Sequence, residues 1–304
     1  MSDSPDFRRF RMRFVRLAVS TLTVFLLLSL FGCASGRGGS IPEISTLAVL
    51  DGDSDLYIAV PVKHHRELVV SLVSSQTGLS EKNASLVAGR MGNLYLGLGC
   101  QLDSGRIQIS SDGDFPSFAV DMALSEGNGW SKKNYVASSS DEALSAGYPN
   151  QFRYYAGSGV PYCVSFPTQH EMLVAKDIRP LLENYALRRS PSELDYACAL
   201  NLDENKSNDI LFYSSNPSRL ASAIIGDMAS SWFVHAEGKL RKSSSGDYLL
   251  EADLVLGDRN RKTVVMTLMA LAGIPVTSTG ETSVYVSGIK INAKKIGGLL
   301  GSGI

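Results

Sequence analysis

Histidine and cysteine are scarce in this chain of 304 residues, which contains four of each. No two cysteines have the C-x-x-C spacing of a zinc or redox site, and no two histidines have the H-E-x-x-H spacing of a zincin helix. His64 and His65 open a predicted helix without a second ligand on the same face, and His170 and His235 are isolated. The sequence therefore predicts neither a metal ion nor a cofactor.

Sequence motifs for nucleophilic and nucleotide chemistry are missing as well. Serine is frequent, but there is no G-x-S-x-G nucleophile elbow and no S-x-x-K motif joined to its partner motifs. The glycines between residues 89 and 99 follow a predicted helix and enter a strand, whereas a phosphate-binding loop follows a strand and opens a helix. We therefore assign no catalytic residue and expect no nucleotide site.

Neither sign of charge is in large excess. The first 32 residues carry five of the 29 basic and two of the 30 acidic residues, so that residues 33–304 hold 24 and 28, a formal net charge of −4. Proteins that bind nucleic acid need basic stripes or patches to neutralise phosphates. This mildly acidic body is therefore not expected to have a nucleic-acid partner.

What the sequence does contain is a leader whose composition differs from the rest. Five arginines between Arg8 and Arg16 precede the apolar run Leu17–Phe31. A basic start, a short apolar segment and a small residue before the cut are the parts of a secretory signal peptide. The run is shorter than the ~20 residues that a membrane-spanning helix needs. We assign residues 1–32 as a signal peptide, with Met12 as an alternative start.

The residues at the expected cut, Leu30-Phe31-Gly32-Cys33, resemble the lipobox of bacterial lipoproteins. Phe31 stands where a smaller or β-branched residue is commoner in that family, and relaxed motifs of this kind occur in spirochaetes. The resemblance implies that signal peptidase II cleaves between Gly32 and Cys33. It also implies that diacylglycerol and further acyl chains such as palmitate are attached to Cys33, which anchors the protein to membrane lipid in the bacterial envelope, facing the periplasm or the cell surface.

Two other interpretations of the leader stay open at this point. The apolar run is an uncleaved membrane helix, or the signal is cut elsewhere and Cys33 is incidental. If the chain is a lipoprotein, residues 33–46 form a lipidated tether, because Ala34–Ser40 is small and glycine-rich and such segments are flexible. Ala34 does not decide between the inner and the outer membrane.

The remaining sequence predicts an α+β fold, with antiparallel sheets and helices packed on one face. A strand at 55–60, which begins with an aspartate, is followed by a helix and several strands. A similar order begins again with the aspartate of the strand at 209–213. We therefore divide the body into two related halves, 47–160 and 161–304, as a duplicated unit would produce.

Individual elements follow from hydrophobic periodicity, capping residues and turn residues. Residues 125–159 are polar and rich in Ser, Gly and Asn, and we interpret them as an exposed excursion. We expect strands at 55–60, 93–99, 106–111, 117–124, 209–213, 232–240, 248–256 and 283–292, a hairpin at 162–175, and helices at 63–75, from 80, at 180–189, from 216 and at 259–271.

Three cysteines follow Cys33, namely Cys100, Cys163 and Cys198. An exported protein can form disulfides, but an odd number with this spacing matches no disulfide framework. We interpret the three as small buried apolar residues, with one disulfide among them as the alternative.

Aromatic residues gather late in the first half. Exposed tyrosines near proline and glycine favour a contact surface for a peptide, a glycan or a partner protein. Alternation in a half-buried strand explains part of the same pattern and is the simpler interpretation. The candidate contact residues are Tyr148, Phe152, Tyr154, Tyr155 and Tyr162.

Taken as a whole, the sequence predicts a membrane-anchored envelope lipoprotein with a non-enzymatic binding, scaffold or assembly role. One alternative is a periplasmic hydrolase or ligand-capturing enzyme that uses dispersed catalytic residues, since such residues often lie on separate loops. A pocket that gathers acids with His170 or His235 would favour that enzyme. A surface adhesin is the other alternative.

Overall fold

A computed structural model describes residues 46–52, 54–77, 79–99, 107–138, 150–187, 207–217, 232–293 and 296. Gly32, Cys33 and the rest of the leader and tether lie outside these ranges, as do Tyr148, Cys100 and Cys198. Residues 44–304 form one compact unit.

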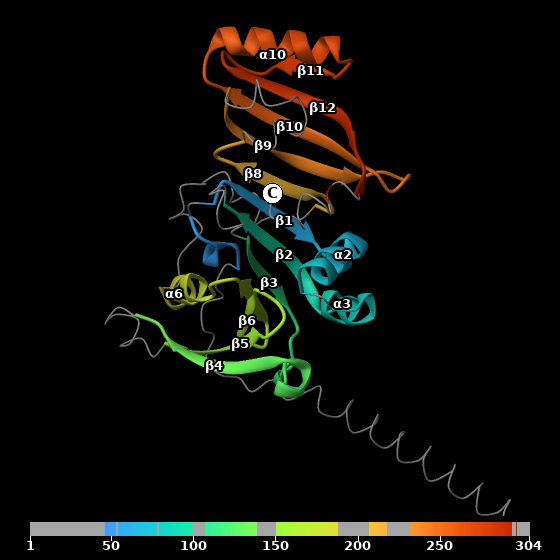
Figure 1. Ribbon diagram of the computed structural model, residues 1–304. Coiled ribbons are helices and arrows are strands. Elements are labelled where there is room, and N and C mark those ends of the chain that lie inside the picture. Colours follow the sequence, from blue (N-terminus) through green and yellow to red (C-terminus); the bar gives the residue numbers. More distant parts are fainter. Residues whose placement is uncertain are drawn as a thin grey trace, which may run out of the picture. The chain divides into compact units, whose positions relative to one another are not determined.

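In the described ranges, twelve strands form a single sheet in the order β11-β12-β10-β9-β8-β1-β2-β3-β7-β6-β5-β4 (Figure 1). All of its neighbouring strands pair antiparallel, so the predicted α+β class with antiparallel pairing is confirmed. The strands are β1 Leu56–Pro61, β2 Met91–Leu98, β3 Ile107–Gly113, β4 Trp130–Val136, β5 Gln151–Gly157, β6 Cys163–Thr168, β7 Glu171–Ala175, β8 Ile210–Ser214, β9 Phe233–Lys242, β10 Tyr248–Leu256, β11 Val276–Ser278 and β12 Ser283–Ile291.

Helices pack against the sheet and are short. They are the 3₁₀ turns η1 Leu47–Val49 and η2 Glu126–Asn128, and the α-helices α2 Arg66–Thr77, α3 Glu81–Ala88, α4 Ser117–Ala123, α6 Arg179–Leu187 and α10 Arg259–Leu271. The side chain of Ser80 caps α3 by accepting a hydrogen bond from the backbone N–H of Asn83, as the sequence predicted.

Successive residues of β1 enter two different cores, because side chains alternate across a strand. Leu56, Ile58 and Val60 join the larger core with Leu68, Val69 and Leu72 of α2. Tyr57 and Ala59 join a second core with η1 and with Leu181, Leu182 and Tyr185 of α6. Helices therefore cover both faces of the sheet and not one, as Figure 1 shows for α2 and α6.

The strand pairings repeat along the chain. β1 pairs with β2, β2 with β3 and β3 with β7, while β8 pairs with β9, β9 with β10 and β10 with β12. α4 follows β3, and α10 follows β10 in the same way. β6 and β7, which we had placed in the second half from residue 161, pair with β5 and β3 and so lie with the first group of strands. This repetition supports duplication, which stays a prediction.

Two segments differ from the sequence prediction. Residues 117–124 were expected to be a strand but form α4, which begins directly after Pro116. In this helix Val120 and Leu124 pack on the larger core, while Phe118 and Met122 point to solvent. Apolar residues stand at every second position from 118 to 124, which is the spacing of one strand face and explains the prediction, but the helix separates them into a packed pair and an exposed pair. The excursion 125–159 contains β4 and β5, which form the polar edge of the sheet.

Gly238 in β9 is a position where any side chain would meet backbone. A Cβ there would overlap the carbonyl oxygen of Glu251 and would lie 2.8 Å from the Cα of Ala252. Gly238→Ala is expected to lower the free energy of unfolding by about 1–3 kcal/mol, as overpacking does. Gly159→Ala is the control, because nothing lies within 4 Å of its Cβ position. Urea denaturation of both variants checks this, and equal stability of the two would contradict the close packing at Gly238.

Candidate functional site

α10 is apolar on two sides. Asp258 caps the helix by accepting a hydrogen bond from the backbone N–H of Arg261 at 2.8 Å. Val265 and Met269 are buried in a small core with β9, β10 and β12. A second set of apolar side chains, spaced four and three residues apart along the other side of the helix, is exposed: Val264 at 43%, Leu268 at 46% and Leu271 at 81%.

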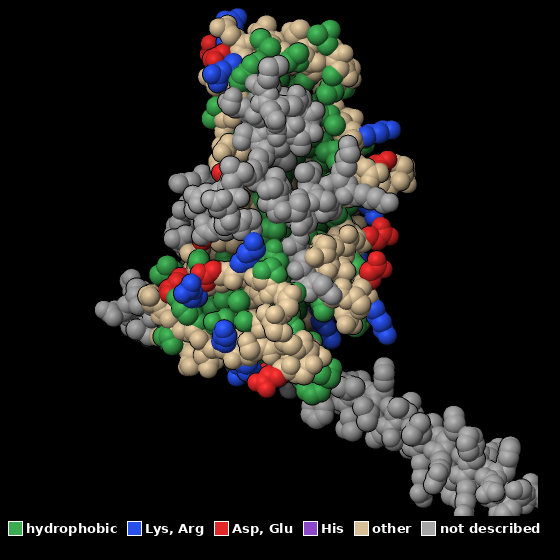
Figure 2. Space-filling view, in the orientation of Figure 1, with side chains coloured by type: hydrophobic (Ala, Val, Ile, Leu, Met, Phe, Trp, Pro, Cys, Tyr) green, Lys and Arg blue, Asp and Glu red, His purple; other side chains and the backbone are tan. Residues whose placement is uncertain are grey.

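These three residues form a continuous strip, which we call the α10 stripe (Val264, Leu268 and Leu271). Figure 2 shows apolar side chains reaching the surface over α10. α4 exposes Phe118 and Met122 in a similar way, at 74% and 62%. Single exposed apolar residues are ordinary, but an aligned set on one helix indicates a surface that contacts something apolar.

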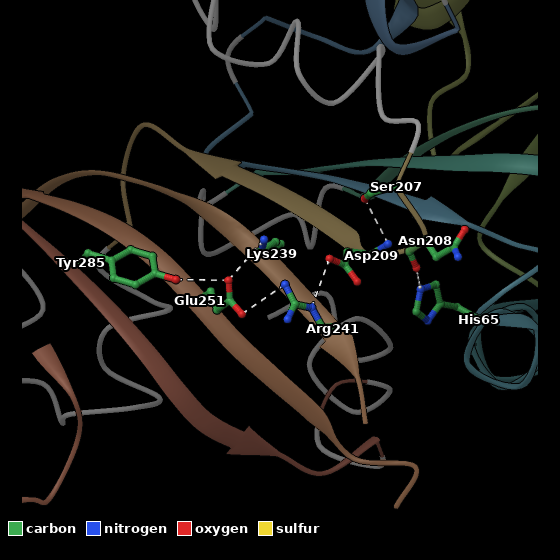
Figure 3. A network of polar contacts seen from close by, with 8 residues as sticks. All are labelled: His65, Ser207, Asn208, Asp209, Lys239, Arg241, Glu251 and Tyr285. Atoms are coloured by element: carbon green, nitrogen blue, oxygen red, sulfur yellow. Dashed lines mark hydrogen bonds and ion pairs between the residues drawn. The ribbon is translucent and has the colours of Figure 1, made fainter. Parts of the chain in front are cut away.

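Below α10, one face of the C-terminal strands carries a row of paired charges (Figure 3). Glu251 is bonded by Lys239 at 3.2 Å, by Arg241 at 3.4 Å and by the hydroxyl of Tyr285 at 3.1 Å. Arg241 also contacts Asp209 at 3.6 Å. Burial raises the pKa of Glu251, but the hydrogen bonds from Lys239 and Tyr285 outweigh it, and the pKa lies below its usual range. These charges therefore bind one another across strands β8, β9, β10 and β12.

His65 is the buried histidine of the described chain, with 1% of its surface exposed. One ring nitrogen lies 2.7 Å from the carbonyl oxygen of Asn208 and the other 2.9 Å from the hydroxyl of Tyr248. Burial lowers the pKa of His65 below 6.5, so the ring is held neutral at pH 7.

The segment that follows the tether is fixed to the second core. Leu47, Ala48, Val49 and Leu50 are at most 1% exposed. Four side chains of the sheet and of α6 bond to its backbone: Ser110 to the Thr46 carbonyl at 2.7 Å, Asn184 to the Val49 carbonyl at 3.0 Å, Tyr57 to the Asp51 carbonyl at 2.5 Å, and Gln108 to the Asp51 N–H at 2.8 Å. We call residues 46–51 the entry segment.

The predicted aromatic contact surface is not assembled by the structure. Phe152 is buried in the second core, whereas Tyr155 and Tyr162 are buried in the larger core on the other face. Tyr154 is half-buried, and Tyr148 lies outside the described residues. Alternation in a half-buried strand explains these positions, so the exposed surface proposed from their spacing is wrong for the three buried residues.

The other candidate residues stay apart. His170 is an exposed turn residue, and His235 lies beside Glu237 at 3.8 Å on β9. Cys163 is a free, half-buried thiol whose pKa is raised by burial. Within the described ranges, no three His, Cys, Asp or Glu side chains gather as ligands for a metal ion. None of the helices described is long and apolar enough to cross a membrane.

Sequence reasoning missed two features, one exposed and one buried. The α10 stripe is readable as a second i, i+4, i+7 pattern beside Val265 and Met269, but only the existence of the helix was predicted. His65 carried no such signal, because its partners Asn208 and Tyr248 follow it by 143 and 183 residues.

Comparison with known proteins gives a consistent result. The family model described as outer membrane-associated lipoprotein TP0453 matches residues 42–297. Crystal form I of TP0453 has the same fold, with a TM-score of 0.65, 15% sequence identity and coverage of 86% of this chain and 98% of that one. Crystal form III gives 0.61, 15%, 86% and 100%, and form IV gives 0.57, 14%, 85% and 97%. No curated protein sequence matches the chain.

An α+β body built on one long antiparallel sheet, with apolar side chains exposed on its outer helices, thus falls in the class of membrane-associated envelope lipoproteins. Within that class, the chain belongs to the family of the outer membrane-associated lipoprotein TP0453. The predicted location in the bacterial envelope is confirmed, and the family is described as associated with the outer membrane.

Proposed function

We propose that this protein is an outer-membrane lipoprotein that is anchored by acyl chains on Cys33 and serves a non-enzymatic binding or scaffold role. The α10 stripe carries the proposal, because it gives the body its own means of contact with the membrane surface. Family membership supports the location, and the lipobox-like residues before Cys33 support the anchor.

The tether sets how far the body can be from the bilayer. Residues 33–46 span roughly 45 Å when fully extended, at about 3.3–3.6 Å per residue. A small, glycine-rich segment such as Ala34–Ser40 is flexible, so its average span is shorter. An anchored body therefore samples the bilayer surface continually, and weak contacts of its own become effective.

The α10 stripe supplies such a contact. Leu268 is the central residue of the stripe and Leu271 is the most exposed one. Full burial of a leucine side chain contributes about 1.5–3 kcal/mol. The stripe lies beside the buried side formed by Val265 and Met269 and is made of different residues, so its exposed side chains are available for contact while that side stays packed in the small core. A helix that lies in the membrane interface places an apolar side about 5–10 Å into the boundary between headgroups and acyl chains, and the stripe supplies such a side.

The test uses the mature-length chain, residues 33–304, with Cys33→Ser, so that binding by the body is measured without the acyl chains. Replacing Leu268 and Leu271 together by glutamate is expected to weaken flotation with phospholipid vesicles by tenfold or more, because about 1–2 kcal/mol of burial is lost at each position. Thr263→Glu is the control, since it adds a charge to the exposed side of α10 away from the stripe.

Equal flotation of the double variant and the control would contradict a contact through α10. A fall of the same size in both would indicate a general charge effect and would also contradict it. Circular dichroism of each variant checks that the helix is retained.

The binding or scaffold role concerns a second partner, an envelope protein, a peptide or a glycan. The charged side chains of the C-terminal strands pair with one another and hold the strands together. This pairing supports a structural role for these charges and not a catalytic one. Cross-linking in intact cells followed by purification of the lipidated protein tests this role. A reproducible cross-linked envelope component is expected, and turnover of a substrate by the purified protein would instead favour the hydrolase.

A further inference from the structure

The two groups of strands in the sheet are joined by a short pairing. β1 and β8 pair over four residue pairs, from Leu56 with Ser214 to Ala59 with Leu211, whereas β1 and β2 pair over six. Past Ala59, β1 continues to Pro61 and the turn that opens α2. Beyond that point, side chains of the described residues, among them His65, Glu67 and Lys242, connect the two strand groups.

His65 lies at this position and contacts both the chain before β8 and the start of β10 (Figure 3 shows its bond to Asn208). A carbonyl oxygen can only accept, so the nitrogen beside Asn208 is Nε2 carrying its proton. Nδ1 then accepts the proton of the Tyr248 hydroxyl. The neutral ring therefore satisfies both partners, and we call this arrangement the His65 bridge (His65, Asn208 and Tyr248).

The bridge also fixes the start of a helix. The carbonyl of His65 accepts from the backbone N–H of Val69 at 3.1 Å, which begins the hydrogen-bonding pattern of α2. Leu68 and Val69 in the first turn of α2 are buried in the same core as Tyr248. A change at His65 is therefore transmitted to the contact between α2 and strand β10.

Charged groups surround the ring unevenly. Lys242, at the end of β9, and His64, which precedes His65 in the chain, disfavour a positive charge on His65, whereas Asp209 favours one. Asp209 is already bonded to Arg241 at 3.6 Å, and Lys242 pairs with Glu67 of α2 at 3.7 Å. Burial is the largest cause of the lowered pKa of His65.

We propose that the His65 bridge is an acid-sensitive contact, which holds α2 to the C-terminal strands at neutral pH and releases it when the ring is protonated. Protonation places a second N–H against the Tyr248 hydroxyl, which must then turn its own proton away. It also leaves a positive charge in a site where little water can reach it.

The sign of the pH effect follows from proton binding. The opened state, in which His65 is exposed and titrates near 6.5, binds more protons than the closed state. Opening therefore becomes easier as the pH falls below 6.5, until the closed state is protonated as well. From pH 7.5 to pH 5.5 the population of the opened state is expected to rise, with about tenfold as the upper limit that applies when the closed state stays neutral throughout.

Hydrogen–deuterium exchange of the full mature protein measures this population. Protection factors of the α2 amides, corrected for the intrinsic exchange rate at each pH, are expected to fall between pH 7.5 and pH 5.5, by at most about tenfold. His65→Gln keeps a donor and an acceptor without titrating, and is expected to remove the pH dependence. His64→Gln, at an exposed position, is the matched control and should retain it.

Two results would overturn the proposal. The first is an unchanged pH dependence in His65→Gln. The second needs no variant: NMR titration of the wild-type imidazoles in which His65 titrates at or above 6.5 would show that the closed state does not disfavour the proton. A titration of His65 below 6.5, with Nε2 carrying the proton at neutral pH, is the expected result.

Discussion

Leu50→Ala is expected to lower the free energy of unfolding by about 2–5 kcal/mol, which is the range for a leucine removed from a well-packed core. Leu50 lies in the entry segment and is fully buried against α6 and the sheet. The segment cannot collapse into the space left behind, because Ser110, Asn184 and Tyr57 hold its backbone by hydrogen bonds. Urea denaturation followed by circular dichroism measures the loss.

Leu86→Ala is the matched control for this prediction. Leu86 lies on α3 and is 63% exposed, so its truncation is expected to change stability by no more than about 0.5 kcal/mol. Similar losses in both variants would show that the entry segment is not packed as the structure has it. A large loss at Leu50 alone would show that the chain is part of the folded core from the first residues after the tether.

Cys33→Ser is expected to abolish incorporation of a palmitate label in growing cells, because signal peptidase II processing and acylation both require the thiol that the lipobox resemblance assigns to Cys33. Purification of the protein followed by detection of the label measures this. Cys163→Ser is the control, since Cys163 is a free thiol in the folded body and is expected to leave labelling intact.

The expected effect is all-or-none for a physical reason. Each buried methylene contributes about 0.8 kcal/mol to membrane binding, and a single acyl chain holds a protein only marginally, so stable anchoring needs two chains. A diacylglyceryl group meets that need without further help. Labelling that persists in Cys33→Ser would place the lipid elsewhere, and labelling lost in Cys163→Ser would contradict the assignment to Cys33.

Most of the fold could be predicted from local pattern. The predicted strands at 232–240 and 248–256 appear as β9 and β10, and the predicted helix at 259–271 appears as α10 with the same bounds. The first half of β10 alternates between buried and partly exposed residues and the helix has its capping aspartate, so each of these signals lies within or directly beside the segment itself. In these elements, the pattern of apolar and polar residues in the segment itself indicates which side is buried.

The errors arose where burial depends on distant residues. β4 is polar because it forms the edge of the sheet, and only its pairing with β5 makes it a strand. Phe152 and Tyr155 were read as candidates for an exposed surface, but the two faces of the sheet are covered by α6 and by α4, which local sequence does not reveal. The His65 bridge joins residues more than 140 positions apart, so no local pattern reports it.

We propose that acyl chains on the sulfur atom of Cys33 hold this body at the outer membrane. Intact-mass and amino-terminal peptide mass spectrometry of the protein purified from cell membranes tests it most directly. We predict a polypeptide that begins at Cys33 and carries the added mass of a diacylglyceryl group with or without an amide-linked acyl chain. A chain that still begins at Met1 or Met12, or an unmodified thiol at position 33, would contradict the account.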